Sequence, residues 1–543
     1  MSKALPPDQP DLDASDLDVN EFAIEDEDDS PASAVPPPLH GAALFSAAFA
    51  LALGTFMQVL DSTIANVALN TISGNLGEAS STATWVITAF AVANGVTVPL
   101  TGWLMRRFGL VNTFIASVAL FTLASFLCGI AWSLPSLIVF RLLQGAVSGP
   151  MIPGSQALLL AIFPPEKRTV GLSIWSMTAL VGPVLGPILG GYISDNYHWG
   201  WIFLINVPVG FITVGVLMAR MRAYNTPPVK LPFDWGGVAL LILWVGSLQV
   251  VLDLGKDEDW FNSTMICFLA AVAVIGFFAW LIWELTEEHP AVDLTLFKSR
   301  NFAIGTLCFC LGYGFFFASN LLMPLWLQTQ QGYTATWAGL VSAPAGMMAF
   351  LLAPLVARAA GTLDLRYVAT YALLAFAGSY MMRTGFAPDT DLWHFVLPSI
   401  VQGTAMGTFF MSMTTLSFDR LGPHRIPSAT GISNFARITG GAFAASITTT
   451  FWDRREVLHQ SRLAEAANPS NPAYVQAMNH LQGIGMSKTQ ATGALTGQMI
   501  NQSYLLSSLD IFWFAGMGCI AMLALLWCTR KPAPPQGGAV VVD

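Results

Sequence analysis

The chain has 543 residues, of which 54% are hydrophobic and only 10% are charged. Soluble domains carry about 25% charged residues, so this composition excludes an ordinary soluble enzyme and indicates a membrane protein. The formal charge of −9 is concentrated at one end, because residues 1–40 hold eleven acidic side chains against Lys3 alone.

Residues 1–40 are expected to form a disordered acidic cytoplasmic tail, because a highly charged segment with few aromatic side chains cannot bury an apolar core. The tail lacks the basic start and the cleavage pattern of a signal peptide, so the first hydrophobic segment should be an uncleaved anchor. A dispensable solvated tail and a tail with a regulatory or partner-binding role are both open interpretations.

Fourteen apolar segments are long enough to cross a bilayer, which requires roughly 20 residues. The predicted fold class is therefore an all-α membrane protein with fourteen transmembrane helices, which the repeat described below arranges as 6+2+6. The segments lie near 42–68, 82–105, 111–132, 134–161, 169–193, 201–219, 235–254, 264–284, 302–324, 335–357, 367–386, 394–417, 428–450 and 508–528.

The distribution of basic residues predicts the orientation. An even number of spans places both termini on one side, and sixteen basic residues fall in segments on that side. The short loops on the other side hold only Lys256 and Arg383, although the longer outer segment 451–507 adds four more. Loops rich in lysine and arginine stay in the cytoplasm, so both termini are expected to be cytoplasmic.

The sequence repeats internally. The tetrapeptide TATW at Thr82 returns at Thr334, and the pair QG at Gln144 returns at Gln402. Ordered matches at nearly constant offsets, 252 and 258 residues, indicate two repeated halves lying parallel to each other, as in many transporters. The expected domains are the tail 1–40, an N-terminal six-helix half 41–220, two inserted helices with a cytoplasmic linker 221–300, a C-terminal six-helix half 301–528 that includes the outer loop 451–507, and a cytoplasmic tail 529–543.

Asp61 is the first candidate for proton coupling. It lies in the first span beside a polar helix face on which Gln58, Ser62, Asn66 and Asn70 recur every four residues. A carboxylate in the bilayer core costs roughly 2.5–3.5 kcal/mol on insertion scales, so it should face a cavity or a partner. Its protonation would then depend on which side of the membrane is open, although a static structural acid is the alternative.

Arg141 in the fourth span is the second candidate for proton coupling, because a fixed positive charge changes the proton affinity of a nearby carboxylate. An arginine that only ties helix ends together is the alternative. The repeat places Ser399 at the corresponding position, so the charged residues are expected mainly in the first half. The tentative substrate-cavity residues are Gln58, Asn66, Gln144, Gln402, Asn434 and Arg437, and for Arg437 a structural role is equally open.

Glycines recur every four residues in the fifth span and predict a smooth face for close helix contact. A moving contact and ordinary packing both fit this spacing. The residues of this candidate conformational motif are Gly182, Gly186, Pro187, Gly190 and Gly191.

The loop after the second span is a candidate cytoplasmic gate, with Gly102, Arg107 and Gly109 as its residues. The alternative is that its arginines only follow the positive-inside bias.

Cofactor chemistry is not expected. The six cysteines lie in apolar segments, which argues against disulfides and against a zinc site. The one Gly-Lys pair, at Gly255, lacks the glycine-rich sequence of a phosphate-binding loop, so ATP is not expected to drive the protein directly. No metal and no cofactor are predicted, and the proton gradient is the expected energy source.

These motifs resemble the major facilitator superfamily, and the fourteen spans resemble its drug:proton antiporter branch. The stretches Thr55–Asp61, His198–Pro208, Val292–Asn301 and Asn468–Pro472 are similar to multidrug exporters of the EmrB type, and the resemblance covers about 41–528. One departure is Arg106, which stands where the superfamily's loop motif usually has an aspartate.

The resemblance implies an exporter in the inner membrane of a Gram-negative bacterium that works with a periplasmic membrane-fusion adaptor and an outer-membrane channel. It assigns the family's first-span acid to Asp61 and its fourth-span arginine to Arg141, and it assigns the antiporter motif to the glycines and Pro187 of the fifth span.

The predicted function is proton-coupled export of small hydrophobic toxic compounds, neutral or weakly acidic, by alternating access. The outer loop 451–507 is the candidate site for adaptor docking. The lipid bilayer is an expected partner and nucleic acid is not. Export of an endogenous metabolite or siderophore is the alternative. A membrane-bound enzyme or a non-transporting receptor is less favoured, because no loop carries clustered catalytic residues and the halves repeat.

Overall fold

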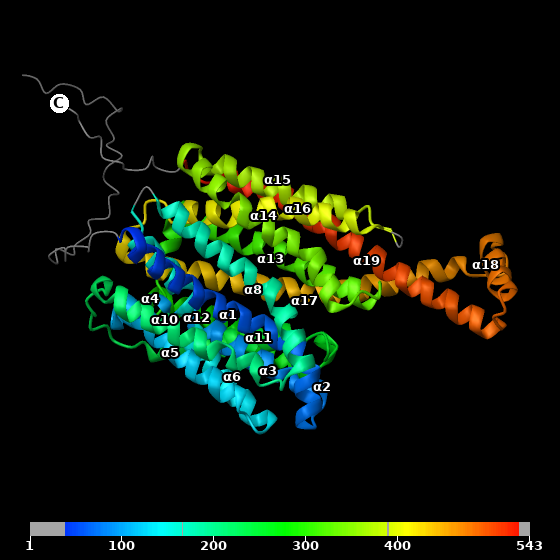
Figure 1. Ribbon diagram of the computed structural model, residues 1–543, viewed down its shortest axis with the longest axis horizontal. Helices are drawn as coiled ribbons and strands as arrows, with labels where there is room; N and C mark the ends of the chain where they lie inside the picture. Colours follow the sequence, from blue (N-terminus) through cyan, green and yellow to red (C-terminus); the bar gives the residue numbers. More distant parts are fainter. Residues whose placement is uncertain (1–38, 165–166, 388–389, 532–543) are drawn as a thin grey trace, which may run out of the picture. The chain divides into compact units, whose positions relative to one another are not determined.

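A computed structural model describes residues 39–164, 167–387 and 390–531 (Figure 1). Most of the expected tails 1–40 and 529–543 therefore lies outside the described residues, as does the side chain of Pro187. The expected domain boundaries stay a prediction.

Each of the fourteen expected spans is helical. The helices of the expected first half are α1 (Gly41–Leu76), α2 (Ser80–Ala83), α3 (Trp85–Thr97), α4 (Thr101–Phe108), α5 (Leu110–Gly129), α6 (Leu134–Ser148), α7 (Met151–Ile162), α8 (Arg168–Asn196), α9 (Trp201–Leu204) and α10 (Asn206–Arg220). The inserted region and the linker contain η2 (Arg222–Tyr224), α11 (Trp235–Leu254), η3 (Trp260–Asn262), α12 (Thr264–Thr286) and η4 (Leu294–Lys298). The expected second half contains α13 (Arg300–Thr329), α14 (Ala335–Thr362), α15 (Leu365–Arg383), α16 (Leu392–Ser417), η5 (Pro423–Arg425), α17 (Ile426–Ala466), α18 (Pro472–Gly483) and α19 (Lys488–Trp527).

The helices are those of a protein that lies in a membrane. Within the described chain, nine are long and apolar enough to cross a bilayer, and α3 with α4 adds a tenth when both are counted as one bent span. On α12, the large apolar side chains of Phe268, Ile275 and Ile282 are 67%, 70% and 64% exposed. Such a surface is unfavourable in water and suited to lipid tails.

The second expected span, 82–105, is not straight. α3 and α4 meet at an angle of 61°. Pro99 lies at the break and has no backbone N–H to donate, so the helical hydrogen bonds cannot continue through it. The bend brings α4 into contact with α17 of the second half.

The two ends of the bundle are defined by where the described chain starts and stops. We call the end that holds residues 39 and 531 the inner end, and the opposite one the outer end. At the inner end the Arg530 amide donates to the side chain of Asn301, at 2.7 Å. Asp364 caps α15 there, and the hydrogen bond from Arg366 holds the pKa of that carboxyl below its usual value.

The expected outer loop is a helical hairpin. α17 has 41 residues, and at about 1.5 Å per residue it is roughly twice as long as the ~30 Å hydrocarbon core. α17 and α19 therefore continue outward together as far as α18 (Figure 1). Asp510 of α19 ties them by accepting from Arg455 at 2.6 Å and contacting His459 at 2.8 Å. We call residues 451–507 the outer hairpin.

A capping box begins α19. Ser487 Oγ accepts from the Gln490 amide at 3.3 Å, and Gln490 Oε1 accepts from the Ser487 amide at 2.9 Å. These two bonds satisfy backbone N–H groups that have no partner within the helix.

Ser487→Ala should fray the first turns of α19, because loss of a helix cap costs about 0.5–2 kcal/mol. Hydrogen exchange of the amides at 488–492 measures this and should accelerate. Ser470→Ala, in the exposed turn of the same hairpin, is the matched control and should leave those amides unchanged. Equal exchange in both variants would contradict the capping role.

Candidate functional site

Asp61 and Arg141 form an ion pair in the interior of the bundle. Arg141 Nη1 lies 2.5 Å from Asp61 Oδ2, and the two side chains are 1% and 0% exposed. Asp61 comes from the middle of α1 and Arg141 from α6. The two predicted proton-coupling residues are therefore direct partners, whereas their role in coupling stays a prediction.

Two side-chain amides complete the environment of the carboxylate. Asp61 Oδ1 accepts from Gln144 Nε2 at 3.0 Å and from Asn206 Nδ2 at 2.9 Å. Both amides also donate to Ser125 Oγ, at 2.8 and 3.0 Å respectively. Residues of α1, α5, α6 and α10 thus meet in one network, which we call the Asp61 cluster (Asp61, Ser125, Arg141, Gln144 and Asn206).

Sequence reasoning did not identify Ser125 and Asn206 as members of this cluster. Each is a single polar residue at a helix position whose orientation becomes clear only when the helices are packed. Asn206 lies within a stretch that resembles the family, but no spacing within its own helix connects it to Asp61.

The guanidinium of Arg141 has partners besides the carboxylate. Its Nε donates to the carbonyl oxygen of Val86 at 3.1 Å, and its Nη1 donates to Gln144 Oε1 at 2.7 Å. Its Cζ lies over the rings of Phe90 and Phe203, at 4.2 and 5.4 Å from their centroids. Arg141 can therefore keep several favourable contacts when the ion pair is broken.

The hydrogen bonds to Asp61 favour its charged form in this conformation. A carboxylate that accepts three hydrogen bonds, one of them from a guanidinium, is stabilised as the anion. Protonation would remove the charge that holds Arg141 and would replace one acceptor by a donor. The Asp61 cluster is thus a group of packed side chains whose arrangement depends on one proton.

Of the other predicted residues on α1, Gln58 is buried and Asn66 is exposed. Gln58 Oε1 has no hydrogen-bond partner within the part of the chain that the structure describes. The two residues therefore do not share one environment, and a substrate role for either stays a prediction. Gln144, also assigned to the cavity, lies in the Asp61 cluster.

Gln402 binds an arginine, Arg383, that the sequence assigned to an outer loop. Arg383 is the last residue of α15, yet its side chain is 2% exposed and points into the second half. Its Nη2 donates to Gln402 Oε1 at 2.6 Å, and its Nη1 donates to Ser319 Oγ. Counting basic residues in loops misplaced Arg383, because the count uses only the position of a residue in the sequence. The side chain of a residue at the end of a helix can still point into the protein.

Asn434 and Arg437 lie where α17 meets the first half. Asn434 Nδ2 donates to Gln156 Oε1 of α7 at 2.7 Å, a hydrogen bond between the two halves. Arg437 Nε donates to Asn434 Oδ1 at 3.2 Å, and its Cζ lies 4.8 Å from the centre of the Tyr313 ring. Among the described residues, no atom accepts from Arg437 Nη2, although this nitrogen is buried.

The predicted glycine face in α8 exists, and it packs against α1. A methyl group at Gly182 would collide with Val59, and one at Gly190 would come within 3.0 Å of Ile64. At Gly186 it would collide with Thr63, two residues from Asp61. The face therefore belongs to the same half as the Asp61 cluster, and its role as a moving contact stays a prediction.

Gly191 does not take part in this contact. Nothing in the described chain lies within 4 Å of a methyl group built at that position.

The predicted gate residues lie at the inner end. Gly102 packs so closely against Ser428 of α17 that a methyl group would lie 2.6 Å from the Ser428 Cα. Gly109 has a φ of +91°, which favours glycine, and a methyl group would reach the Asn225 side chain. Across residues 39–164, 167–387 and 390–531, no ion pair to Arg107 is found.

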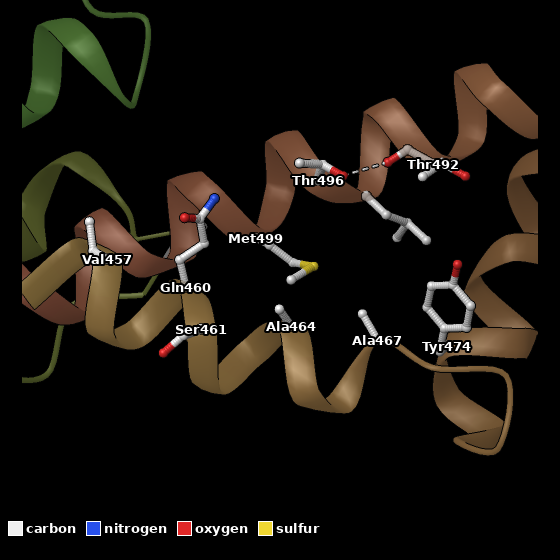
Figure 2. A pocket seen from close by; sticks show the side chains of 10 residues that line it. Val457, Gln460, Ser461, Ala464, Ala467, Tyr474, Thr492, Thr496 and Met499 are labelled. Carbon is white, nitrogen blue, oxygen red and sulfur yellow. Dashed lines mark hydrogen bonds between the residues drawn. The ribbon is translucent and has the colours of Figure 1, made fainter.

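A pocket of about 400 Å³ lies in the outer hairpin, between α17 and α19 and beside α18 (Figure 2). Apolar atoms and hydroxyl groups line it. The lining residues include Val457, Ala464, Tyr474, Leu495, Thr496 and Met499.

Among the described residues, no group of three or more His, Cys, Asp or Glu side chains converges as a possible set of metal ligands. The chemistry that the Asp61 cluster offers is proton binding and a change of hydrogen bonds.

Arg141→Met should lower the stability of the protein by about 3–5 kcal/mol, because it leaves a buried carboxylate without its counter-charge. The loss should be larger at pH 8 than at pH 5, since the lone Asp61 carboxyl is more readily protonated at the lower pH. Thermal unfolding of the purified protein measures this.

The double variant Asp61→Asn with Arg141→Met should recover part of the loss, and Arg106→Met, at an exposed position, is the control. Strictly additive losses in the double variant would contradict a direct pairing.

Comparison with known proteins places this architecture. The model of the Major Facilitator Superfamily matches residues 51–445. The chain is 47% identical over 502 residues to the multidrug export protein EmrB of Escherichia coli (strain K12), covering 92% of this chain and 98% of that protein. It is 43% identical over 502 residues to the fatty acid resistance protein FarB of Neisseria gonorrhoeae, covering 92% and 99%.

A solved structure of the proton:xylose symporter XylE shares the fold, with a TM-score of 0.57 at 14% identity, covering 89% of this chain and 95% of that one. The predicted fold class and family resemblance are confirmed, and the enzyme alternative is excluded by the family. The chain belongs to the Major Facilitator Superfamily and is a membrane transporter related to EmrB.

Proposed function

We propose that the protein is a proton-coupled antiporter that exports hydrophobic, neutral or weakly acidic toxic compounds by alternating access. The observation that carries the proposal is the fully buried Asp61–Arg141 pair. The names of similar proteins, which refer to multidrug export and to fatty acid resistance, support the substrate class. The proton gradient supplies the energy without a cofactor. The protein works in the bacterial inner membrane, with both termini in the cytoplasm.

The described conformation is closed at the inner end. α4 touches α17 through Gly102 and Ser428, and Asn434 binds Gln156 across the halves. In this state Asp61 is charged. A proton that reaches Asp61 from the outer side neutralises it and releases Arg141 towards the Val86 carbonyl and the Phe90 ring. The helices α1, α5, α6 and α10 then lose a constraint that holds them together.

Substrate binds between the halves, near Asn434 and Arg437. The buried Arg437 Nη2 is a positively charged donor, and the Tyr313 ring beside it offers an apolar surface. A guanidinium next to an aromatic ring suits a hydrophobic molecule that carries a weak acid.

Asp61→Asn should abolish proton-driven export in proteoliposomes, because an amide occupies the same volume but cannot exchange a proton. Counterflow, which needs no net proton movement, should persist. Asp253→Asn is the matched control, since Asp253 also lies in a membrane helix, where it accepts from Gln249 at 3.0 Å. Full gradient-driven export by the Asp61→Asn protein would refute the assignment.

We further propose that the exporter is the inner-membrane pump of a tripartite system, with a periplasmic membrane-fusion adaptor and an outer-membrane channel. The adaptor docks on the outer hairpin. Support comes from the length of α17 and α19, which carries the hairpin beyond the other helices, and from the pocket at its surface (Figure 2).

Ala464→Arg should block adaptor docking, because it places a long charged side chain in the pocket wall. Drug resistance in cells should be lost while export by the purified protein in proteoliposomes is kept. Ala466→Arg, on the same helix at an exposed position outside the pocket lining, is the control. Resistance that survives Ala464→Arg would place the docking site elsewhere.

A further inference from the structure

The second half contains a buried cluster of its own around Arg383. Ser319 of α13, Tyr380 and Arg383 of α15, and Gln402 of α16 are each at most 2% exposed. Arg383 donates to Ser319 and to Gln402, and its Cζ lies 5.5 Å from the centre of the Phe512 ring. We call Ser319, Tyr380, Arg383 and Gln402 the Arg383 cluster.

The Arg383 cluster occupies the positions that the repeat assigns to the Asp61 cluster. Ser319, Arg383 and Gln402 each follow their counterparts Asp61, Ser125 and Gln144 by 258 residues. The helices correspond as well, with α13, α15 and α16 in place of α1, α5 and α6. Both sets of three positions converge through hydrogen bonds.

The exchange of residues between the halves changes the balance of charge. In the first half an arginine meets an aspartate. In the second half the arginine has moved to the position of Ser125, and a serine stands at the position of Asp61. A serine is smaller than an aspartate and carries no charge. The second half thus keeps the cation and lacks the anion.

Three buried donors of the Arg383 cluster have no acceptor. Within the ranges that the structure describes, no hydrogen-bond partner is found for Arg383 Nε, Gln402 Nε2 or the Tyr380 hydroxyl. No acidic side chain of the described residues pairs with Arg383. A buried cation without a counter-charge is unfavourable, and so are buried donors without acceptors. A negatively charged acceptor beside Arg383 would supply the missing counter-charge and an acceptor for these donors.

We propose that the Arg383 cluster binds a small monovalent anion, which takes the place of the missing aspartate carboxylate. Because the missing group is a carboxylate, the expected ion is about that size, such as chloride, bromide or formate. The same chemistry is offered by the carboxylate of an exported acid, so two sources of the anion must be distinguished.

The test uses the purified full-length protein without substrate. Its thermal unfolding temperature is measured in chloride, bromide, formate and gluconate at equal ionic strength, with octanoate as a separate probe. Ligands that bind only the folded state raise this temperature in a saturable way. We expect a rise with chloride, bromide and formate, and none with gluconate, which is too large for the cluster.

Arg383→Gln should weaken the apparent affinity for chloride by about tenfold to a hundredfold, as expected for the loss of hydrogen bonds to a charged group. Arg366→Gln, on the same helix but outside the Arg383 cluster and paired with Asp364, is the matched control and should keep the chloride effect. A rise with octanoate alone that Arg383→Gln removes would assign the site to the carboxylate of an exported acid.

Ser319→Asp tests the proposal even where Arg383→Gln fails to fold. The new carboxylate restores the ion pair seen in the first half. In gluconate, this variant should therefore be as stable as the unaltered protein is in chloride. Chloride should no longer raise its unfolding temperature. Unfolding temperatures of the unaltered protein that are equal in all anions would overturn the proposal. Asp389 lies outside the described residues. If chloride stabilises only the Asp389→Asn variant, the proposal is also overturned, because the Asp389 carboxylate would then be the anion that Arg383 binds in the unaltered protein.

Discussion

The burial of one negative charge organises the first half of this transporter. Asp61 has no exposure to solvent, so its charge must be balanced inside the bundle. Arg141 supplies the charge, and Gln144 and Asn206 supply the remaining hydrogen bonds. These partners come from two other helices, α6 and α10, and the glycine face of α8 packs on α1 within two residues of the acid. A change in the proton on Asp61 therefore acts on the packing of several helices at once.

The two halves share a framework but not its electrostatics. The glutamine is kept in both halves, at Gln144 and Gln402, and in each half it binds the local arginine. Among the described residues, only the first half adds a carboxylate to its cluster. A carboxyl group is thus built into the cluster of one half, while the cluster of the other keeps a fixed positive charge. Repeated folds allow such a division, because the helices are positioned by packing and the residues at one site can change independently.

The sequence was sufficient to predict the fourteen helical spans and to single out Asp61 and Arg141, because apolar length and a charged residue in an apolar segment are local signals. It could not reveal that Ser125 and Asn206 join them, since each comes from a separate helix. It misplaced Arg383, because the positive-inside rule counts residues by position and not by the direction of the side chain. The partner of the glycine face also required the packed structure.

Two described contacts between the halves near the inner end are neutral. Ser428 packs on Gly102, and Asn434 binds Gln156, whereas Arg107 joins no ion pair among the residues that the structure describes. A neutral hydrogen bond contributes about 0.5–1.5 kcal/mol net, and a difference of one pKa unit between two conformations corresponds to about 1.4 kcal/mol. Binding a proton at Asp61 is therefore comparable in free energy to breaking a few such contacts. A closure held by buried ion pairs would need more, because removing one partner of a buried pair costs about 3–5 kcal/mol.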